Sequence, residues 1–493
     1  MITDALRDFL RYVPSRIIPA VAAVAVVPFL TRLLSPGEYG RYTLAIAGVT
    51  FFTAISSSWI TTSAIRFVPA YTQDGRLPRG IGLLVGMFLI TISGSSLVAG
   101  AGALVLAGRD AGPTVYGAVA LLLCAATATH EFLLGLLRSR RRATTFTTLT
   151  AVAGTAGYAL AVALAALVEP SASAVIAGFL LAVVLVLPFT ARRALAGVRP
   201  SFSGIPRADV REVLQYGLPA LLINGLTWVT VLSDRYVLAA LQGEQAVGIY
   251  AASRDLSDKM LVVLNTLFLL ASTPVGVTVW ERDGEPAARD FVVALTRYYL
   301  LLATPLAVGM SVLSRPLIGF LADPRYHAGY RLVPLVAVGT LFAGLATRYT
   351  LGLTFRKRTG LLSLCYVGAA VVNVGLNLVL VPRFGYMAAA ASHLLSFVVL
   401  LILTRAVSRR LFAWPFPRTA TIKVGVGVSV MGLAVWFVTR PIGHPGVQLA
   451  VGVPVGIATY ILAILSLHVL RPGERAALAR LVGRPPASEP PGP

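Results

Sequence analysis

The sequence is poor in charged residues, which make up 13% of its 493 residues, while apolar residues make up 57%. Soluble globular domains carry about 25% charged residues, so this composition excludes an ordinary soluble domain. A helix that crosses a bilayer needs about 20 mostly apolar residues. The composition therefore predicts an all-α polytopic membrane protein.

Cysteine is also scarce, since Cys124 and Cys365 are the only 2 in the chain and both lie in apolar runs. This spacing gives little support to a disulfide, a metal site or thiol chemistry, and we expect two small core or lipid-facing residues. HExxH, DxD and paired-histidine patterns, which would indicate a metal-dependent enzyme, are missing from the sequence. We predict no cofactor and no metal, and we do not expect an enzyme.

Basic residues are abundant, with 42 Lys and Arg against 20 Asp and Glu. The arginines form short clusters between apolar runs and do not share one face with interleaved aromatic residues, so nucleic-acid binding is not favoured. The positive-inside rule, by which Lys and Arg gather in the cytoplasmic connections of membrane proteins, explains these clusters better. Residues 1–11 lack a signal-peptide pattern, and we expect an interfacial amphipathic start before a retained first span.

The apolar runs predict about 14 spans, which begin near Val13, Thr43, Ile81, Thr114, Phe146, Ala172, Gln215, Gly248, Phe291, Leu332, Leu361, Tyr386, Thr419 and Val447. With a cytoplasmic N-terminus, the arginine clusters at 138–142, 192–193, 356–358 and 405–410 all fall in inner connections. The outer connections hold few basic residues. This alternation predicts that both termini are cytoplasmic.

Two segments of the sequence resemble each other, "TRLLSPGEYGRYTL" at 31–44 and "SDRYVLAALQGEQAVGIYAA" at 233–252. A second pair, "LLGLLRSRRRATT" at 133–145 and "TLGLTFRKRTG" at 350–360, supports the same register. We infer two copies of a unit of about six spans, related by a pseudo-two-fold axis along the membrane normal. The predicted divisions are 1–205 (first lobe), 206–418 (second lobe), 419–470 (two additional spans) and 471–493 (a basic, proline-rich cytoplasmic tail).

The segments "LTRLLSPGEYGRYTLA", "DRYVLAALQGEQAVGIYAAS" and "NVGLNLVLVPRFGYMAAAAS" resemble the Wzx-type polysaccharide-biosynthesis flippases, in the superfamily of the MATE drug exporters and the lipid II flippases. The resemblance implies alternating access in the bacterial inner membrane, with an ion gradient as the driving force. The cargo would be an undecaprenyl-diphosphate-linked oligosaccharide that moves from the inner to the outer leaflet. Its partners would be that lipid-linked substrate, membrane lipids and polysaccharide polymerase or assembly proteins.

Two departures from related branches keep alternatives open. The lipid II branch typically carries an Arg-Asp pair within its first span, where this chain has Ala22-Ala23. The MATE branch relies on acidic residues in its first lobe, whereas the first span here has none. The alternatives are a cation-coupled exporter of small amphipathic molecules, a membrane polymerase or ligase for polysaccharide, and an assembly scaffold.

Arginines near the span ends are candidate ligands for a diphosphate. Arg32 and Arg235 occupy equivalent positions of the repeat, and a guanidinium group binds phosphate oxygens through two parallel hydrogen bonds. The alternatives are that Arg32 extends to the outer surface and that Arg235 pairs with Asp234 or Glu244. Arg66, at the inner end of the second span, is expected to be an interfacial anchor or a cation of the cleft.

A cluster of charges opens the eighth span, with Arg254, Asp255, Asp258 and Lys259 within one to two turns. Arg254 and Asp258 are four residues apart, as are Asp255 and Lys259, so each pair can neutralise itself along the helix. The other interpretation is that these residues line the transport cavity, where Arg254 and Lys259 would bind the substrate. Asp234, Asp255 and Asp258 would then take part in ion coupling. A desolvated Lys259 could then couple transport to protons.

Glu131 and Arg348 stand at equivalent places of the repeat, four residues before Gly135 and Gly352. We predict that they approach each other across the cleft and form a gate when the inner side closes. The alternative is that each satisfies a neighbour in its own lobe. Asn265, Asn373 and Asn377 are expected to hydrogen-bond between helices rather than to bind sugar.

Overall fold

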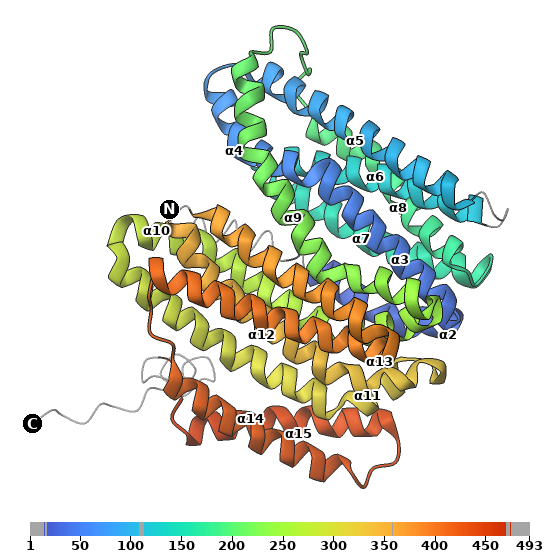
Figure 1. Cartoon of the computed structure of the whole chain (residues 1–493), viewed down its shortest axis with the longest axis vertical. Helices are drawn as coiled ribbons and strands as arrows, with labels where there is room; N and C mark the ends of the chain where they lie inside the picture. Colours follow the sequence, from blue (N-terminus) through green and yellow to red (C-terminus); the bar gives the residue numbers. More distant parts are fainter. Residues whose placement is uncertain (1–13, 15–16, 108–112, 357, 470–473, 475–493) are drawn as a thin grey trace, which may run out of the picture.

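The computed structural model describes residues 14, 17–107, 113–356, 358–469 and 474, which are almost entirely helical and include no strand. Figure 1 shows two groups of helices, one above the other, with the helices of each group running side by side. The expected amphipathic start at 1–11 lies outside the described residues. So does the tail, apart from Glu474.

The upper group in Figure 1 contains the N-terminal helices, which are α2 (Val27–Leu33), α3 (Pro36–Thr53), η1 (Ala54–Ser58), α4 (Trp59–Gln73), α5 (Leu77–Ala107), α6 (Pro113–Ser139), α7 (Ala143–Leu167) and α8 (Ala172–Ala194). The following elements are α9 (Arg207–Gln242), α10 (Glu244–Val312), α11 (Ser314–Leu321), η2 (Pro324–Leu332), α12 (Val333–Phe355) and α13 (Thr359–Leu411). Helix α9 starts beside α4 and then packs along α13. Helices α14 (Arg418–Thr439) and α15 (Pro445–Ser466) follow and lie on the outside of the second lobe.

The described residues account for the predicted number of spans, because 11 of their helices are long and apolar enough to cross a membrane. One of these, α13, is broken at Gly385 (φ 57°) and supplies two crossings, and α10 is broken at Gly284 (φ 81°). The first arm of α10 contains Arg254, Asp255, Asp258 and Lys259, which lower its hydropathy. The second crossing of α13, the first arm of α10 and the short apolar helix Ile17–Leu33 add three crossings to these 11, which makes 14.

Some connections are shorter than the sequence predicts. The span predicted to begin near Gln215 belongs to α9, which already begins at Arg207, and α8 continues to Ala194, so the connection between them covers only 195–206. The second span likewise begins seven residues before Thr43, since Pro36 starts α3 and the Ser35 hydroxyl accepts a hydrogen bond from the Glu38 N–H (3.2 Å). Hydropathy locates the apolar part of a helix and misses polar turns that extend beyond it.

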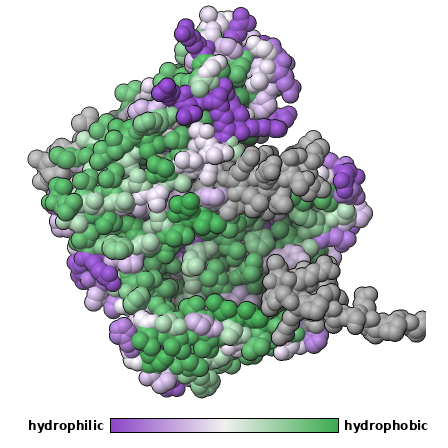
Figure 2. Space-filling view, turned by 180° about the vertical axis from the view of Figure 1, so that it is seen from behind, coloured by the Kyte–Doolittle hydropathy of each residue, from purple (hydrophilic) through white to green (hydrophobic). Residues whose placement is uncertain are grey.

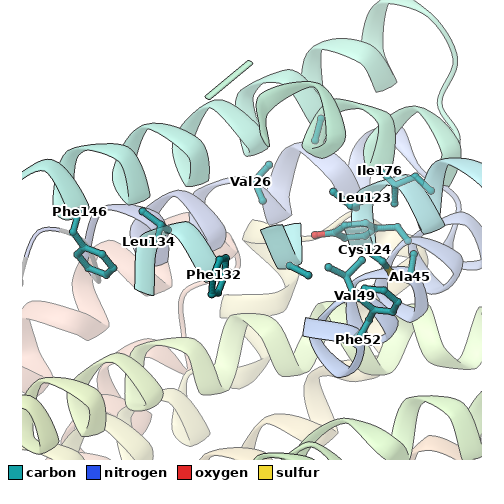
Figure 3. Packing of buried hydrophobic residues seen from close by; sticks show 14 of the residues in the cluster. Val26, Ala45, Val49, Phe52, Leu123, Cys124, Phe132, Leu134, Phe146 and Ile176 are labelled. Atoms are coloured by element: carbon teal, nitrogen blue, oxygen red, sulfur yellow. The ribbon is translucent and has the colours of Figure 1, made fainter. Parts of the chain in front are cut away.

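Apolar side chains fill the interior of the first lobe. Figure 3 shows Cys124 in the same buried cluster as Ala45 and Val49. Cys124 and Cys365 are both free and buried, as expected for small core residues. Figure 2 shows that apolar residues also cover most of the outer face in that view, with hydrophilic residues toward its margins. This distribution suits a protein that is surrounded by lipid.

Candidate functional site

The two lobes meet where α3 and α10 begin, at helix ends that the sequence predicts to face outward. An added Cβ atom at Gly40 would lie 2.0 Å from the carbonyl oxygen of Glu244. One at Gly248 would lie 1.8 Å from the carbonyl oxygen of Pro36. Only glycine allows backbones to approach this closely. Gly40 and Gly248 are equivalent positions of the predicted repeat, so the same turn of each copy forms the contact between the lobes.

An ion pair on the surface accompanies this glycine contact. The Arg41 side chain donates to the carboxylates of Glu244 (2.5 Å) and Glu38 (3.0 Å), which are also equivalent in the repeat. Glu38 additionally accepts a hydrogen bond from the Ala172 N–H (2.7 Å). The Arg41 side chain is half exposed, and exposed ion pairs contribute little to stability. Backbone packing therefore determines how closely the lobes approach.

Element η2 packs on the same side against the end of the first helix, which is the apolar helix Ile17–Leu33 that includes α2. The Tyr326 hydroxyl donates to the carbonyl oxygen of Leu34 (3.0 Å), and the Arg325 guanidinium donates to that of Arg32 (3.3 Å). The Arg32 side chain itself is exposed. Arg32 thus contributes its backbone to the lobe contact, while its guanidinium lies at the surface, in contrast to the buried Arg235.

A buried network of charges lies one to two turns deeper. The carboxylate of Asp234, on α9, accepts hydrogen bonds from Arg254 and from the Tyr250 hydroxyl, both on α10. The Arg254 Nε atom also donates to Asp258 (3.2 Å), which is the pairing that their spacing predicts. Arg254 is 1% exposed and Asp234 is 0% exposed. Tyr250 was not predicted to take part, although it belongs to the repeated Gly-x-Tyr turn.

The second half of the network is built around Asp255. Arg235 and Lys259 each donate to one oxygen of this carboxylate, both at 3.2 Å. The expected partners of Arg235, Glu244 and the Asp234 carboxylate, are engaged by Arg41 and Arg254 instead. The contact of Asp234 with Arg235 is a hydrogen bond from the Arg235 backbone N–H to the Asp234 carboxylate (2.8 Å). Three acids and three bases thus neutralise one another in this network.

Two members of the network also contact the first lobe. The Arg235 guanidinium donates to the carbonyl oxygen of Thr43 on α3 (3.5 Å), and Lys259 Nζ donates to that of Ala23 in the first helix (3.2 Å). Ala23 belongs to the Ala22-Ala23 pair of the first span. Two basic side chains of the second lobe thus donate hydrogen bonds to main-chain carbonyl oxygens of the first lobe.

Lys259 lines an apolar cavity of about 470 Å³ between the first helix and α10. Most of the lining is aliphatic, including Val21, Val24, Leu264 and Leu267, and Lys259 is the only charged residue among the described residues that line the cavity. A single cation on the wall of an apolar cavity fits an amphiphile with an anionic head and a hydrocarbon chain.

Arg348 is fully buried in the second lobe, on α12. Its guanidinium donates to the side-chain oxygen of Asn265 and to the carbonyl oxygen of Gly344 (3.2 Å). It also lies over the rings of Tyr299 (4.8 Å) and Phe268 (5.5 Å). These partners all belong to the second lobe, and Asn265 links two of its helices as expected.

Glu131 lies in a different place, on the wall of a cavity of about 410 Å³ that is lined by both polar and apolar side chains. Asn224, Thr227 and Trp228 of α9 also line this cavity. Element η1 lines the same cavity with Ala54 and Ser58. Its π-helical turn is a distortion that is frequent at functional sites. The gate between Glu131 and Arg348 stays a prediction.

The remaining candidates are surface or interhelical residues. Arg66 is exposed at the lobe surface. Asn373 accepts hydrogen bonds from Asn377 (3.2 Å) and from Ser233 of α9 (3.4 Å), so it links α13 to α9 as expected. His393 is buried next to this group, within 3.5 Å of Thr340, and nothing in the sequence pattern had singled it out.

Comparisons with known proteins agree with this architecture. The family model described as "Polysaccharide biosynthesis protein" matches residues 5–279. An uncharacterized membrane protein of Methanocaldococcus jannaschii is 23% identical over 272 residues, which are 54% of this chain and 52% of that protein. The chain thus spans about half the length of this curated relative.

Solved structures of transporters share the fold. The lipid II flippase MurJ in an inward closed conformation superposes with a TM-score of 0.75 at 12% identity, covering 97% of this chain and 100% of that one. An inward-facing multidrug resistance MATE family transporter of the MOP superfamily gives 0.61 at 14% identity, covering 81% and 97%. The MATE multidrug transporter DinF-BH gives 0.63 at 15% identity, covering 86% and 97%. These likenesses show a two-lobe helical transporter fold with two helices added at its end.

Proposed function

Because the chain belongs to the polysaccharide biosynthesis protein family, we propose that it is a flippase for an undecaprenyl-diphosphate-linked oligosaccharide, moving it from the inner to the outer leaflet of the bacterial inner membrane. Both termini would be cytoplasmic. The protein would work beside the polymerase and assembly proteins that use its product. The cavity between the first helix and α10 carries this proposal, since it combines apolar walls with Lys259.

The diphosphate would bind first at Lys259. This lysine is the most exposed cation of the buried network, with 24% of its side chain accessible. Its partner Asp255 is already held by Arg235, so Asp255 keeps a positive neighbour when Lys259 turns to the substrate. Arg235 and Arg254 stay paired with carboxylates and stabilise the surrounding helices. The polyprenyl chain would lie along the aliphatic wall.

Alternating access would use the contact of Gly40 with Gly248 as the closed outer side. With that side closed, substrate enters from the inner leaflet, and the lobes then rock about the cavity to release it outside. An ion gradient would drive the cycle through the same network, by protonation or ion binding that competes for Asp255 or Asp258.

Reconstituted protein is expected to flip a fluorescent undecaprenyl-diphosphate oligosaccharide in proteoliposomes, and Lys259→Ala is expected to lower the rate about tenfold, because a charge-assisted contact to the diphosphate is lost. Lys423→Ala is the matched control, since Lys423 lies on α14 and binds the carbonyl oxygen of His468 (3.4 Å). The rate is measured with and without imposed proton and sodium gradients.

Equal rates for Lys259→Ala and Lys423→Ala would remove Lys259 from the substrate site and from coupling. A wild-type protein that exports a cationic dye and flips no lipid-linked oligosaccharide would instead identify an exporter of small amphipathic molecules. Loss of gradient dependence in Lys259→Ala, with the basal rate retained, would assign Lys259 to coupling alone.

The gate between Glu131 and Arg348 is tested by charge exchange. Each single change, Glu131→Arg or Arg348→Glu, is expected to lower transport about tenfold or more, because it places like charges where the lobes must close. The double exchange is expected to restore part of the loss. If the double variant is no more active than the worse single variant, the two residues do not meet during the cycle.

A further inference from the structure

A groove on the outer surface of the first lobe, between α7 and α8, has no role in the proposed transport path. It has a volume of about 620 Å³. One end is polar, with Arg193 and the hydroxyls of Thr144, Thr145 and Thr148. The rest is apolar, lined by Leu149, Val152, Ala156, Ala182, Leu185, Val186 and Phe189. The groove thus has a polar, positively charged end and a long apolar part, which match the head group and the acyl chain of a phospholipid.

The polar end lies where a helix offers free backbone donors. Helix α7 begins at Ala143, and its N-cap residue Arg142 makes no side-chain capping bond. Its first internal hydrogen bond comes from the Phe146 N–H (3.0 Å). The N–H groups of Ala143, Thr144 and Thr145 therefore precede the hydrogen-bonded ladder. A helix N-terminus attracts phosphate through such donors and through its dipole.

The guanidinium of Arg193 adds a positive charge to this end. Its neighbours Arg140 and Arg142 are already used, because they donate to the carbonyl oxygens of Ala194 (2.8 Å) and of Arg193 itself (2.6 Å). Arg193 has an exposed side chain, and none of the ion pairs among the residues that the structure describes includes it. A phosphate at this point would accept hydrogen bonds from the Arg193 guanidinium and from the free N–H groups at the start of α7.

The apolar part of the groove matches one leaflet in length. From Thr144 to Ala156 helix α7 rises by about 18 Å at roughly 1.5 Å per residue. Half of the hydrocarbon core of a bilayer is about 15 Å. Leu185 and Phe189 along the groove are 57% and 65% exposed, so the face is open to the membrane. One acyl chain therefore fits between the arginine-rich surface and the bilayer midplane.

We propose that this groove is a binding site for an anionic glycerophospholipid of the leaflet on the arginine-rich side. Its phosphate binds Arg193 and the N-terminus of α7, and one acyl chain lies between α7 and α8. Basic pockets between helices on the cytoplasmic side commonly hold anionic head groups. The site is separate from the cavity at Lys259, and the inference does not depend on which cargo the protein carries.

Native mass spectrometry of the delipidated full chain tests the proposal, with phosphatidylglycerol and phosphatidylcholine of identical acyl chains as probes. One phosphatidylglycerol is expected to bind more tightly than phosphatidylcholine. Arg193→Gln should weaken its binding about tenfold, as expected for the loss of a charge-assisted hydrogen bond. Arg192→Gln is the matched control, because Arg192 is adjacent and exposed but does not line the groove.

The acyl-chain part is tested with Ala156→Phe, which fills the groove and should weaken both lipids, while an unchanged melting temperature shows that the fold is intact. Equal losses in Arg192→Gln and Arg193→Gln would show general surface charge and overturn the proposal. So would equal affinity for the two lipids. Displacement of phosphatidylglycerol by glycerol 3-phosphate at similar concentration would identify a site for soluble phosphate and also overturn it.

Discussion

Alanine at Gly248 or at Gly40 is expected to prevent the lobes from closing at their outward ends and to abolish most transport. The added Cβ atom would lie 1.8 Å from the carbonyl oxygen of Pro36 in one case and 2.0 Å from that of Glu244 in the other. Both contacts are with backbone, which cannot rotate away. Overpacking costs about 1–3 kcal/mol, which would lower the population of the closed state about 5-fold to 150-fold.

Spin labels on Glu169→Cys and Arg383→Cys, at exposed positions of the two lobes, would report this change as a longer distance across the outward ends. Gly37→Ala is the matched control on α3, because its Cβ atom would meet nothing closer than 3.9 Å. An unchanged distance distribution in Gly248→Ala, with normal transport, would show that the glycine contact does not limit closure.

Replacing Arg254 by Gln is expected to destabilise the protein by about 3–5 kcal/mol, because it leaves the buried carboxylate of Asp234 without its charged partner. Asp234 would keep only the Tyr250 hydroxyl and the Arg235 N–H as donors. The double variant Asp234→Asn, Arg254→Gln removes both charges and should recover much of the loss. Thermal unfolding of the detergent-purified protein measures these differences.

Arg282→Gln serves as the control for this experiment, since its ion pair with Asp283 is exposed and should change the unfolding temperature little. A double variant that is as unstable as Arg254→Gln would argue against the pairing. The lost stability would then come from the packing of the arginine side chain.

The sequence predicted the fold well because the signals for spans and for the repeat are local. Apolar runs, the glycine turns before Tyr42 and Tyr250, and arginine clusters can each be recognised within a short window. The pairs Arg254 with Asp258 and Asp255 with Lys259 were also predictable, since they lie four residues apart on one helix.

The rest of the site depends on which helices become neighbours. Asp255 is 20 residues from Arg235, and their contact arises only when α9 and α10 pack together. Arg348 finds Asn265 on a different helix in the same way. The sequence could not rank these partners, because several carboxylates lie within reach of each arginine until the helices are placed. Cavities have no sequence signal, so the surroundings of Lys259 and of Arg193 emerged only from the structure.

The balanced charges around Asp234 and Asp255 have a consequence for the electrical behaviour of the transporter. A potential of 100 mV does about 2.3 kcal/mol of work on each elementary charge that crosses the membrane. Three positive and three negative side chains that move together with the second lobe contribute no net gating charge. A current recorded during turnover would therefore count the charges on the cargo and on the coupling ion, with the network itself electrically silent.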